Sequence, residues 1–311
     1  MSNDNLEFDE KVFKICNEDY MDFFSKPNVV GIGLGKQVSN RQFTGEKCIT
    51  VFVAGKFPKE LLSKEDLIPP TYKGIKTDVL PSGPISICSF TGKIRPVIGG
   101  FGLSPTTSDE VGSVGCLVKD DNGYYILSNN HVLADTNKLP LDTDIVQPSI
   151  KDRGKNPEDV VAKLTKFVPI EFKNEDNVPE NYVDAAIAKV INEEDVSSKV
   201  AFIGEILGIK PAKLEQSVVK VGRTTEQTFG LVLAERATII VEYGDKKAIF
   251  KNQIVTTKMT SEGDSGSLLT DSEGYAVGLI YAHSQKHSYH NNISDVLNKL
   301  NVKLVTKNMK K

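Results

Sequence analysis

The segment at residues 261–267, with the sequence SEGDSGS, carries the strongest chemical signal in the chain. Its Ser265 lies between Asp264 and Gly266 on what we expect to be a tight turn. A serine hydroxyl becomes a nucleophile only beside a general base, an orienting carboxylate and donors that can receive an oxyanion. A nucleophilic Ser265 therefore requires these partners elsewhere in the chain.

An imidazole base has to come from one of only four histidines, at positions 131, 283, 287 and 290. His131 follows an apolar run and precedes a short apolar segment, where a strand gives way to a turn. One ring nitrogen can stay free at such a junction, although a purely structural histidine fits the same pattern. The other three have a loose metal-like spacing with no interleaved Asp, Glu or Cys. We therefore expect them to be solvated or to border a substrate, and we predict no metal site.

The orienting carboxylate should be held in an apolar segment. Residues 182–190 contain one acid, Asp184, at the head of an apolar strand. A lone carboxylate in such a setting is costly unless it is paired, so its presence asks for a partner. A turn or capping aspartate is the alternative interpretation.

The order His131, Asp184, Ser265 is the one found in chymotrypsin, and it differs from the orders of subtilisin and the α/β-hydrolases. The first two fall in one block of predicted strands and the third in the next. This distribution predicts a site in a cleft between two β-barrels.

The first part of the chain is predicted to be a small α+β unit. Its expected elements are a helix at 9–24, strands at 29–38, 47–53 and 75–80, and a short helix at 58–62. The strand at 29–38 is rich in glycine but lacks phosphate-loop spacing and a following helix. A strand is therefore favoured over control by a nucleotide, which we keep as a weaker hypothesis.

The rest of the chain is predicted to be mainly β. An Asn-Gly turn joins the expected strands 114–118 and 124–127 into a hairpin. The later strands are expected at 217–221, 228–232, 238–242, 248–255, 268–269 and 275–281, with a closing helix at 293–300. We expect an N-terminal domain at 1–94, which is a candidate regulatory unit, a first barrel at 95–200 and a second barrel at 201–311.

Composition excludes several classes of function. The 311 residues carry a net charge of −3, which gives no basic face for nucleic acid. No apolar run approaches the roughly 18 residues that span a bilayer, and the acidic start is unlike a signal peptide. The four cysteines (16, 48, 88 and 116) have no short spacing, so we expect free thiols, no cofactor and a cytoplasmic location.

Several segments together resemble the trypsin-like (chymotrypsin-fold) serine proteases. Within that group the chain is similar to the cytosolic bacterial trypsin-like peptidases related to the plant narrow-leaf protein. The matching segments are residues 29–33, 74–79, 128–134, 183–188, 221–225 and 263–266. The resemblance implies a chymotrypsin-like double β-barrel preceded by the α+β domain. It also implies a serine endopeptidase that acts on protein or peptide substrates, with a homo-oligomer left open.

The resemblance assigns roles by motif. His131 is the base, Asp184 its orienter and Ser265 the nucleophile, with the backbone N–H groups of Gly263 and Ser265 as the oxyanion hole. The expected substrate-binding residues are Met259, Thr260, Gly278 and Tyr281. Met259 stands where relatives that select Lys or Arg have an acid, and residues 278–282 are expected to be an edge strand that pairs with substrate.

Asp264 bears on how the chain would be activated. In trypsin-like enzymes the acid at position 264 can pair with a new N-terminus after cleavage, but nothing here marks a cleavage site. Control by the N-terminal domain or by assembly is the better hypothesis. The alternative function is a latent protease fold that binds or scaffolds peptides, with its cleft occluded by Glu262 or by residues 169–181.

Overall fold

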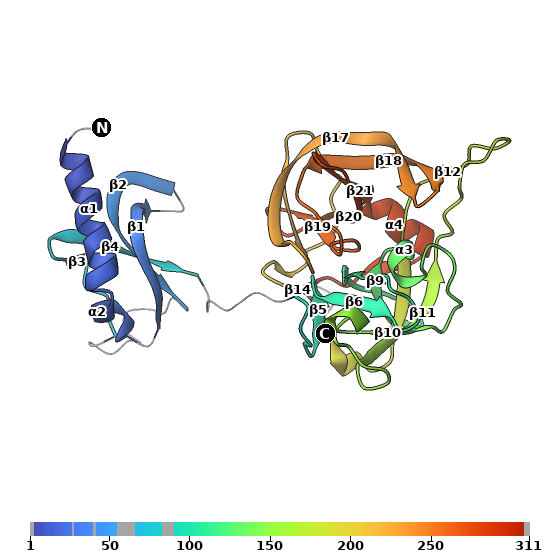
Figure 1. Cartoon of the computed structure of the whole chain (residues 1–311), viewed down its shortest axis with the longest axis horizontal. Coiled ribbons are helices and arrows are strands. Elements are labelled where there is room, and N and C mark those ends of the chain that lie inside the picture. The colour runs from blue at the N-terminus through green and yellow to red at the C-terminus, as the bar shows by residue number, and fades with distance from the viewer. Residues whose placement is uncertain (1–2, 27, 40–41, 55–65, 83–89, 308–311) are drawn as a thin grey trace. The chain divides into compact units, whose positions relative to one another are not determined.

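The computed structural model describes most of the chain. The described residues are 3–26, 28–39, 42–54, 66–82 and 90–307. Their contacts separate two compact units, Met1–Ile87 and Cys88–Lys311, which are drawn in Figure 1. The further division of the second unit near residue 200 stays a prediction.

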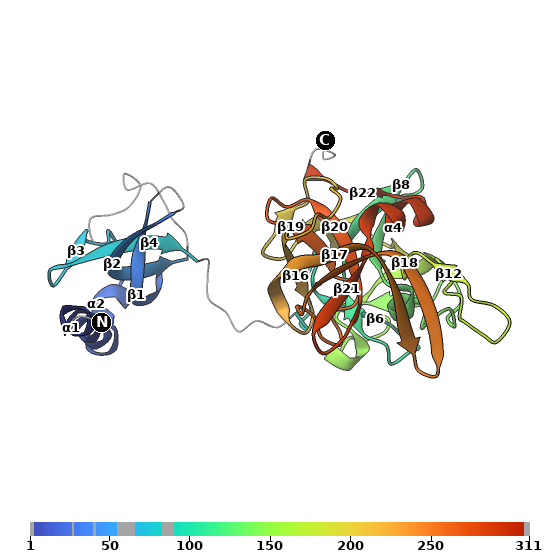
Figure 2. The ribbon, with the colours of Figure 1, turned by 90° about the horizontal axis from the view of Figure 1, so that it is seen from above.

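The first unit is a four-stranded sheet with two helices on one face (Figure 2). The strand order is β1-β2-β4-β3. The elements are α1 (Asn3–Glu18), α2 (Met21–Phe24), β1 (Val29–Ser39), β2 (Gln42–Val53), β3 (Thr71–Tyr72) and β4 (Ile75–Pro81). Val12, Ile15 and Phe23 from the helices pack against buried Ile49 and Val51 of β2. This apolar contact holds the unit together.

The elements of the first unit largely follow the predictions. The strands expected at 29–38, 47–53 and 75–80 are confirmed as β1 and as parts of β2 and β4. The helix at 9–24 begins earlier, at Asn3, and is interrupted between Glu18 and Met21. Residues 3–8 contain no Gly or Pro that would stop it. β1 pairs with the antiparallel β2, so no helix follows the glycines, and the helix expected at 58–62 lies outside the described residues.

The first large sheet of the second unit has the strand order β22-β8-β9-β13-β11-β10-β6-β7. Its strands are β6 (Gly102–Pro105), β7 (Gly112–Ser113), β8 (Cys116–Asp120), β9 (Gly123–Ser128), β10 (Asp144–Val146), β11 (Val160–Phe167), β13 (Ala186–Val190) and β22 (Lys303–Leu304). The predicted Asn-Gly hairpin is confirmed, because β8 and β9 pair down to Asp120 and Gly123. Side chains of this sheet, among them Leu103, Ile126 and Leu164, pack into one buried apolar cluster.

The second large sheet has the order β12-β18-β17-β16-β19-β20-β21, and it closes into a barrel because β18 also pairs with β21. Its strands are β12 (Glu180–Asn181), β16 (Ser217–Gly222), β17 (Glu226–Tyr243), β18 (Lys246–Thr257), β19 (Leu268–Asp271), β20 (Ala276–His283) and β21 (His287–Asn292). The two strands expected at 228–232 and 238–242 are one strand, β17, which runs beside β18 (Figure 1). The segment between the two expected strands contains a series of bulges, and Arg236 adopts a φ of 56° there.

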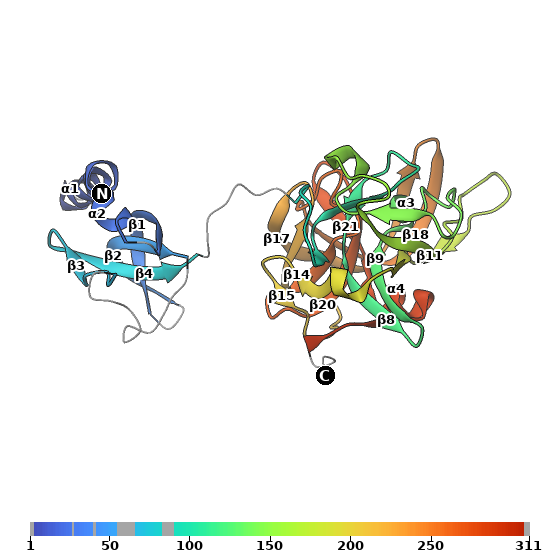
Figure 3. The same cartoon turned by 90° about the horizontal axis from the view of Figure 1, so that it is seen from below.

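Helix α4 (Ile293–Leu300), confirmed at the predicted residues, joins the two sheets of this unit. It lies beside β8 and β9 in Figure 3, and its apolar residues share one buried cluster with Cys116, Leu127, Leu268 and Leu279. The remaining elements are β5 (Val97–Gly99), β14 (Val196–Val200), β15 (Gly204–Glu205), the helix α3 (Asn130–Leu133) and the 3-10 helices Ile150–Asp152 and Glu193–Asp195. The fold is therefore mainly β, as predicted.

Cys16, Cys48 and Cys116 are free thiols, in agreement with the prediction. In the described parts of the chain, none of the helices has the length and apolar character needed to cross a membrane.

The separation into two units makes a prediction about stability. Ile49 is fully buried in the first unit, so Ile49→Ala should cost that unit about 2–5 kcal/mol, and Ile49→Val only about 0.5–1.5 kcal/mol. Amide hydrogen exchange should show lost protection in β1, β2 and β4 with the second unit unchanged. An equal loss of protection in both units would contradict the division.

Candidate functional site

His131 and Asp184 are in direct contact. Nδ1 of His131 lies 2.6 Å from Oδ2 of Asp184, and the backbone N–H of His131 donates to Oδ1 over 3.1 Å. His131 lies on the short helix α3, which follows β9 and is anchored by the buried Val132 and Leu133. Asp184 lies two residues before β13 and is 0% exposed, whereas the His131 side chain is 17% exposed. The two residues that sequence patterns chose as base and orienter therefore form a partly buried pair.

Three further residues hold Asp184, and sequence analysis missed all of them. Its backbone N–H donates to Asn291 Oδ1 at 3.0 Å, and its carbonyl accepts from Asn129 Nδ2 at 2.6 Å. The Tyr243 hydroxyl donates to Oδ2 over 2.8 Å. The two asparagines are 0% exposed. Asn129 follows the apolar strand β9, whereas Asn291 lies in the polar strand β21, so only Asn129 had a local signal in the sequence.

Two opposing effects act on the pKa of His131. Burial of the ring disfavours the charged form, but the charge of Asp184 and its hydrogen bond to Nδ1 outweigh burial, with a smaller contribution from Glu110. The net result is a raised pKa of His131. A hydrogen bond from Nδ1 to the carboxylate also leaves Nε2 as the acceptor.

Ser265 sits on the turn before β19, and Ser113 of β7 holds that turn from the opposite sheet. The N–H of Ser113 donates to the Ser265 carbonyl at 2.7 Å, and its Oγ donates to the Gly263 carbonyl at 2.9 Å. The backbone N–H of Arg223 in turn donates to Ser113 Oγ. One fully buried serine thus fixes two peptides of the nucleophile turn.

Two glycines let this turn adopt its shape. Gly263 has a φ of 91° and Gly266 a φ of 88°, which side chains resist. A Cβ on Gly263 would also lie 2.4 Å from Thr224 Oγ1, and one on Gly266 would lie 2.0 Å from Ser128 Oγ. Among the described residues, no acceptor is assigned to the N–H of Gly263 or Ser265, while those of Asp264 and Gly266 are bonded. Two backbone donors of the turn are therefore open, as an oxyanion hole requires.

The acid of the turn, Asp264, is completely buried and paired with a buried lysine. Lys220 of β16 is also 0% exposed, and its Nζ lies 3.2 Å from Asp264 Oδ2. Asp264 also accepts from the N–H groups of Thr224, Thr225 and Ser261, at 2.9–3.0 Å. Burial lowers the pKa of Lys220, although the charge of Asp264 opposes this. A buried lysine is therefore the partner of the buried acid of the turn, and no sequence pattern had indicated this contact.

Val132, the neighbour of His131, and the Ser265 carbonyl both lie close to Gly112. A Cβ on Gly112 would lie 2.8 Å from the Ser265 carbonyl and 2.6 Å from Val132, the neighbour of His131. Within the described residues, no hydrogen bond is assigned to the Ser265 hydroxyl. The structure thus pairs the acid with the histidine and leaves the serine hydroxyl unbonded.

A cleft of about 620 Å³ opens beside His131. It is lined by residues at the ends of β17 and β20, among them Val241, Tyr243, Tyr281 and His283. Tyr281, predicted to bind substrate, therefore borders the same cleft as the histidine. A ligand that carries both polar and apolar groups fits a space of this size and lining.

The other predicted substrate-binding residues, Met259, Thr260 and Gly278, are absent from the lining of this cleft. The Met259 side chain is 3% exposed and packs in the core of the second barrel. Thr260 is also buried, and its hydroxyl lies 2.8 Å from Ser288 Oγ. The edge strand expected at 278–282 is wrong for Gly278 and Leu279, because β19 and β21 pair with them on both sides. From Ala282 on, the described ladder pairs only with β21, because β19 begins at Leu268, the partner of Leu279.

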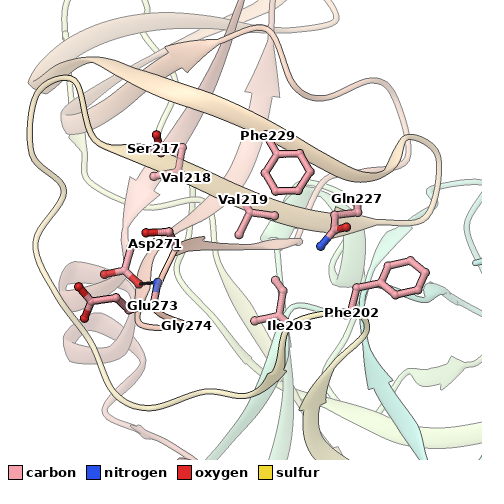
Figure 4. A pocket seen from close by; sticks show the side chains of 11 residues that line it. Phe202, Ile203, Ser217, Val218, Val219, Gln227, Phe229, Asp271, Glu273 and Gly274 are labelled. Carbon is pink, nitrogen blue, oxygen red and sulfur yellow. Dashed lines mark hydrogen bonds between the residues drawn. The ribbon is translucent and has the colours of Figure 1, made fainter. Parts of the chain in front are cut away.

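A second hollow, of about 300 Å³, lies between residues 202–203, strands β16 and β17, and residues 271–274. Figure 4 shows the rings of Phe202 and Phe229 on one side of it and Asp271 and Glu273 on the other. None of the three predicted catalytic residues lines it. In the described part of the chain, no three His, Cys, Asp or Glu side chains gather as metal ligands.

The Lys220–Asp264 pair makes a stability prediction. Lys220→Met should destabilise the second unit by about 3–5 kcal/mol in urea unfolding, because it leaves a buried carboxylate unpaired. Lys220→Met combined with Asp264→Asn should recover part of that loss, since the unpaired charge is gone. An unchanged unfolding midpoint in the single variant would show that the pair carries no such role.

Comparisons with known proteins place the fold and the family. Thermobifida fusca protease A shares 17% identity with this chain, at a TM-score of 0.50, over 68% of this chain and 98% of that one. Nocardiopsis protease shares 18%, also at 0.50, over 68% and 99%. At this identity the likeness concerns the fold alone, and a search of the curated proteins found no match. Residues 112–279, more than half of the chain, match the trypsin-like peptidase domain family. The chain is thus a member of the trypsin-like peptidase family with a chymotrypsin-like fold.

Proposed function

We propose that the chain is a serine endopeptidase that cleaves protein or peptide substrates through His131, Asp184 and Ser265. The observation that carries this proposal is the two-point contact between His131 and the buried Asp184 carboxylate, at 2.6 and 3.1 Å. Membership of the trypsin-like peptidase family supports it, since the matched residues include all three positions.

The geometry supports a proton path through His131. With Nδ1 held by Asp184, Nε2 accepts the proton of the Ser265 hydroxyl as its Oγ attacks the peptide carbonyl carbon. The imidazolium then protonates the leaving amine as the C–N bond breaks, which leaves an acyl-enzyme. A water molecule attacks the acyl group in the same way, and Ser265 is released. The hydrogen bond from serine to histidine often forms only with substrate bound, so its absence here is compatible with this path.

The open backbone donors of the turn support the next step. In this proposal the N–H groups of Gly263 and Ser265 receive the oxyanion of the tetrahedral intermediate. One such donor is worth about 3 kcal/mol in the transition state. Ser113 and Lys220 hold the turn in this shape.

A fluorophosphonate probe tests the nucleophile. The full-length chain should be labelled at one site, and Ser265→Ala or His131→Ala should abolish labelling, as read by intact mass. Ser261→Ala is the matched control, because it removes a hydroxyl from the same turn while keeping the N–H that bonds Asp264. It should be labelled like the wild type.

Failure to label a folded wild-type sample would reject the endopeptidase and favour the latent, peptide-binding alternative. Labelling that survives in Ser265→Ala would place the nucleophile elsewhere. A cleavage profile of a cell extract treated with wild type, with Ser265→Ala as reference, would then identify the substrates.

The raised pKa of His131 predicts the pH dependence. Labelling needs the neutral imidazole, so its rate should rise with pH through a midpoint above about 6.5, the usual pKa of histidine. In Asp184→Asn, burial remains without the opposing charge, and the NMR titration midpoint of His131 should fall below the wild-type value. A wild-type midpoint at or below 6.5 would contradict the raised pKa.

A further inference from the structure

The tip of one long hairpin reaches the buried acid of the proposed triad. β17 ends at Tyr243 and β18 begins at Lys246, so Tyr243 lies beside the turn of the hairpin. Its hydroxyl donates to Oδ2 of Asp184 at 2.8 Å, the same oxygen that binds His131 Nδ1 at 2.6 Å. One carboxylate oxygen therefore binds a group from each barrel. The hairpin can be followed in Figure 2, where β17 and β18 are labelled.

Aromatic packing fixes the Tyr243 ring. The rings of Phe172 and Phe250 lie 5.8 and 6.3 Å from it, and Phe172 meets it edge to face. The His131 ring is also 6.3 Å away. Burial, followed by the charge of Asp184 and the hydrogen bond to it, raises the pKa of Tyr243 well above 10. The hydroxyl therefore remains a neutral donor at every pH at which the enzyme would work.

The same hairpin forms one wall of the cleft beside His131. Ile239, Val241 and Tyr243 line the cleft of about 620 Å³ together with the histidine. A ligand in the cleft therefore touches the strand whose last residue holds Asp184.

We propose that Tyr243 is a positioning residue of the triad: its hydroxyl fixes the Asp184 carboxylate and shares its negative charge. The basicity of His131 then depends on the position of the tip of the β17–β18 hairpin. The inference rests on the proposed peptidase function for its consequence in catalysis. The hydrogen bond itself can be tested without turnover.

The sign of the effect follows from charge sharing. A donor on Oδ2 draws charge away from the carboxylate, so its removal should leave Asp184 a stronger partner for the imidazolium and raise the pKa of His131. The other ionisable groups around His131 are Asp184 and Glu110, with His283 and Glu242 across the cleft. Tyr281 and Tyr289 add hydroxyl groups to the cleft. None of these changes when only the Tyr243 oxygen is removed.

Tyr281 supplies a matched control. Its ring packs 5.0 Å from Phe250 in the same cluster, and Asp184 helps to raise its pKa. Within the described part of the chain, its buried hydroxyl has no hydrogen-bond partner. Tyr281→Phe thus removes a neighbouring phenolic oxygen without touching the carboxylate.

The test compares wild type, Tyr243→Phe and Tyr281→Phe as full-length chains. NMR titration of the four histidines, assigned with His131→Ala, should place the His131 midpoint about half a unit higher in Tyr243→Phe and unchanged in Tyr281→Phe. Where the wild type is labelled by the fluorophosphonate, the midpoint of the pH–rate profile should move by the same amount. The maximal rate should fall several-fold, because the carboxylate has lost one constraint.

A second variant protects the test against misfolding of Tyr243→Phe. 3-Fluorotyrosine at position 243 keeps the ring and strengthens the donor, so the His131 midpoint should move downward. Equal midpoints in all chains, or equal shifts for Tyr243→Phe and Tyr281→Phe, would overturn the inference. Absence of labelling in the wild type would reject the peptidase proposal, and the NMR midpoints would still decide the role of Tyr243.

Discussion

The contact on which the site depends is the one between a fully buried carboxylate and an imidazole. Asp184 has no exposed surface, so its charge must be compensated from within the protein. His131 of the first barrel supplies two hydrogen bonds to the carboxylate and Tyr243 of the second supplies one, while Asn291 accepts a bond from the backbone N–H of Asp184. A buried acid that takes partners from both barrels is satisfied only when the barrels are docked. The surroundings of Asp184 are therefore built from residues of both large sheets.

The same physical arrangement recurs on the serine side of the cleft. Asp264 is as deeply buried as Asp184, and Lys220 together with three backbone N–H groups compensates its charge. Ser113 of the first barrel donates to the carbonyls of Gly263 and Ser265, the two residues that flank Asp264. Buried ion pairs of this kind contribute little net stability, because desolvation consumes most of their attraction. What they provide here is a defined backbone shape at Gly263.

Sequence patterns located the residues whose neighbours in the chain are informative. His131 follows an apolar strand, Asp184 begins one and Ser265 lies in a glycine turn, so each has a local signature. The partners Lys220, Tyr243 and Ser113 have none, because each acts on a residue far away in the chain and looks like an ordinary strand residue. The strands predicted separately at 228–232 and 238–242 were wrong for a related reason. They form one strand, β17, whose bulges depend on its pairing with β18. The open edge expected at Gly278 failed because pairing on both sides is a property of the closed barrel.

The lysine opposite Asp264 also has a consequence in time. Its ammonium group belongs to β16, within the barrel that carries the serine, and it is present as soon as that barrel has folded. No bond has to be cut to produce this positive charge. Lys220 therefore braces the turn when this barrel folds, and the brace needs no charge from another part of the chain.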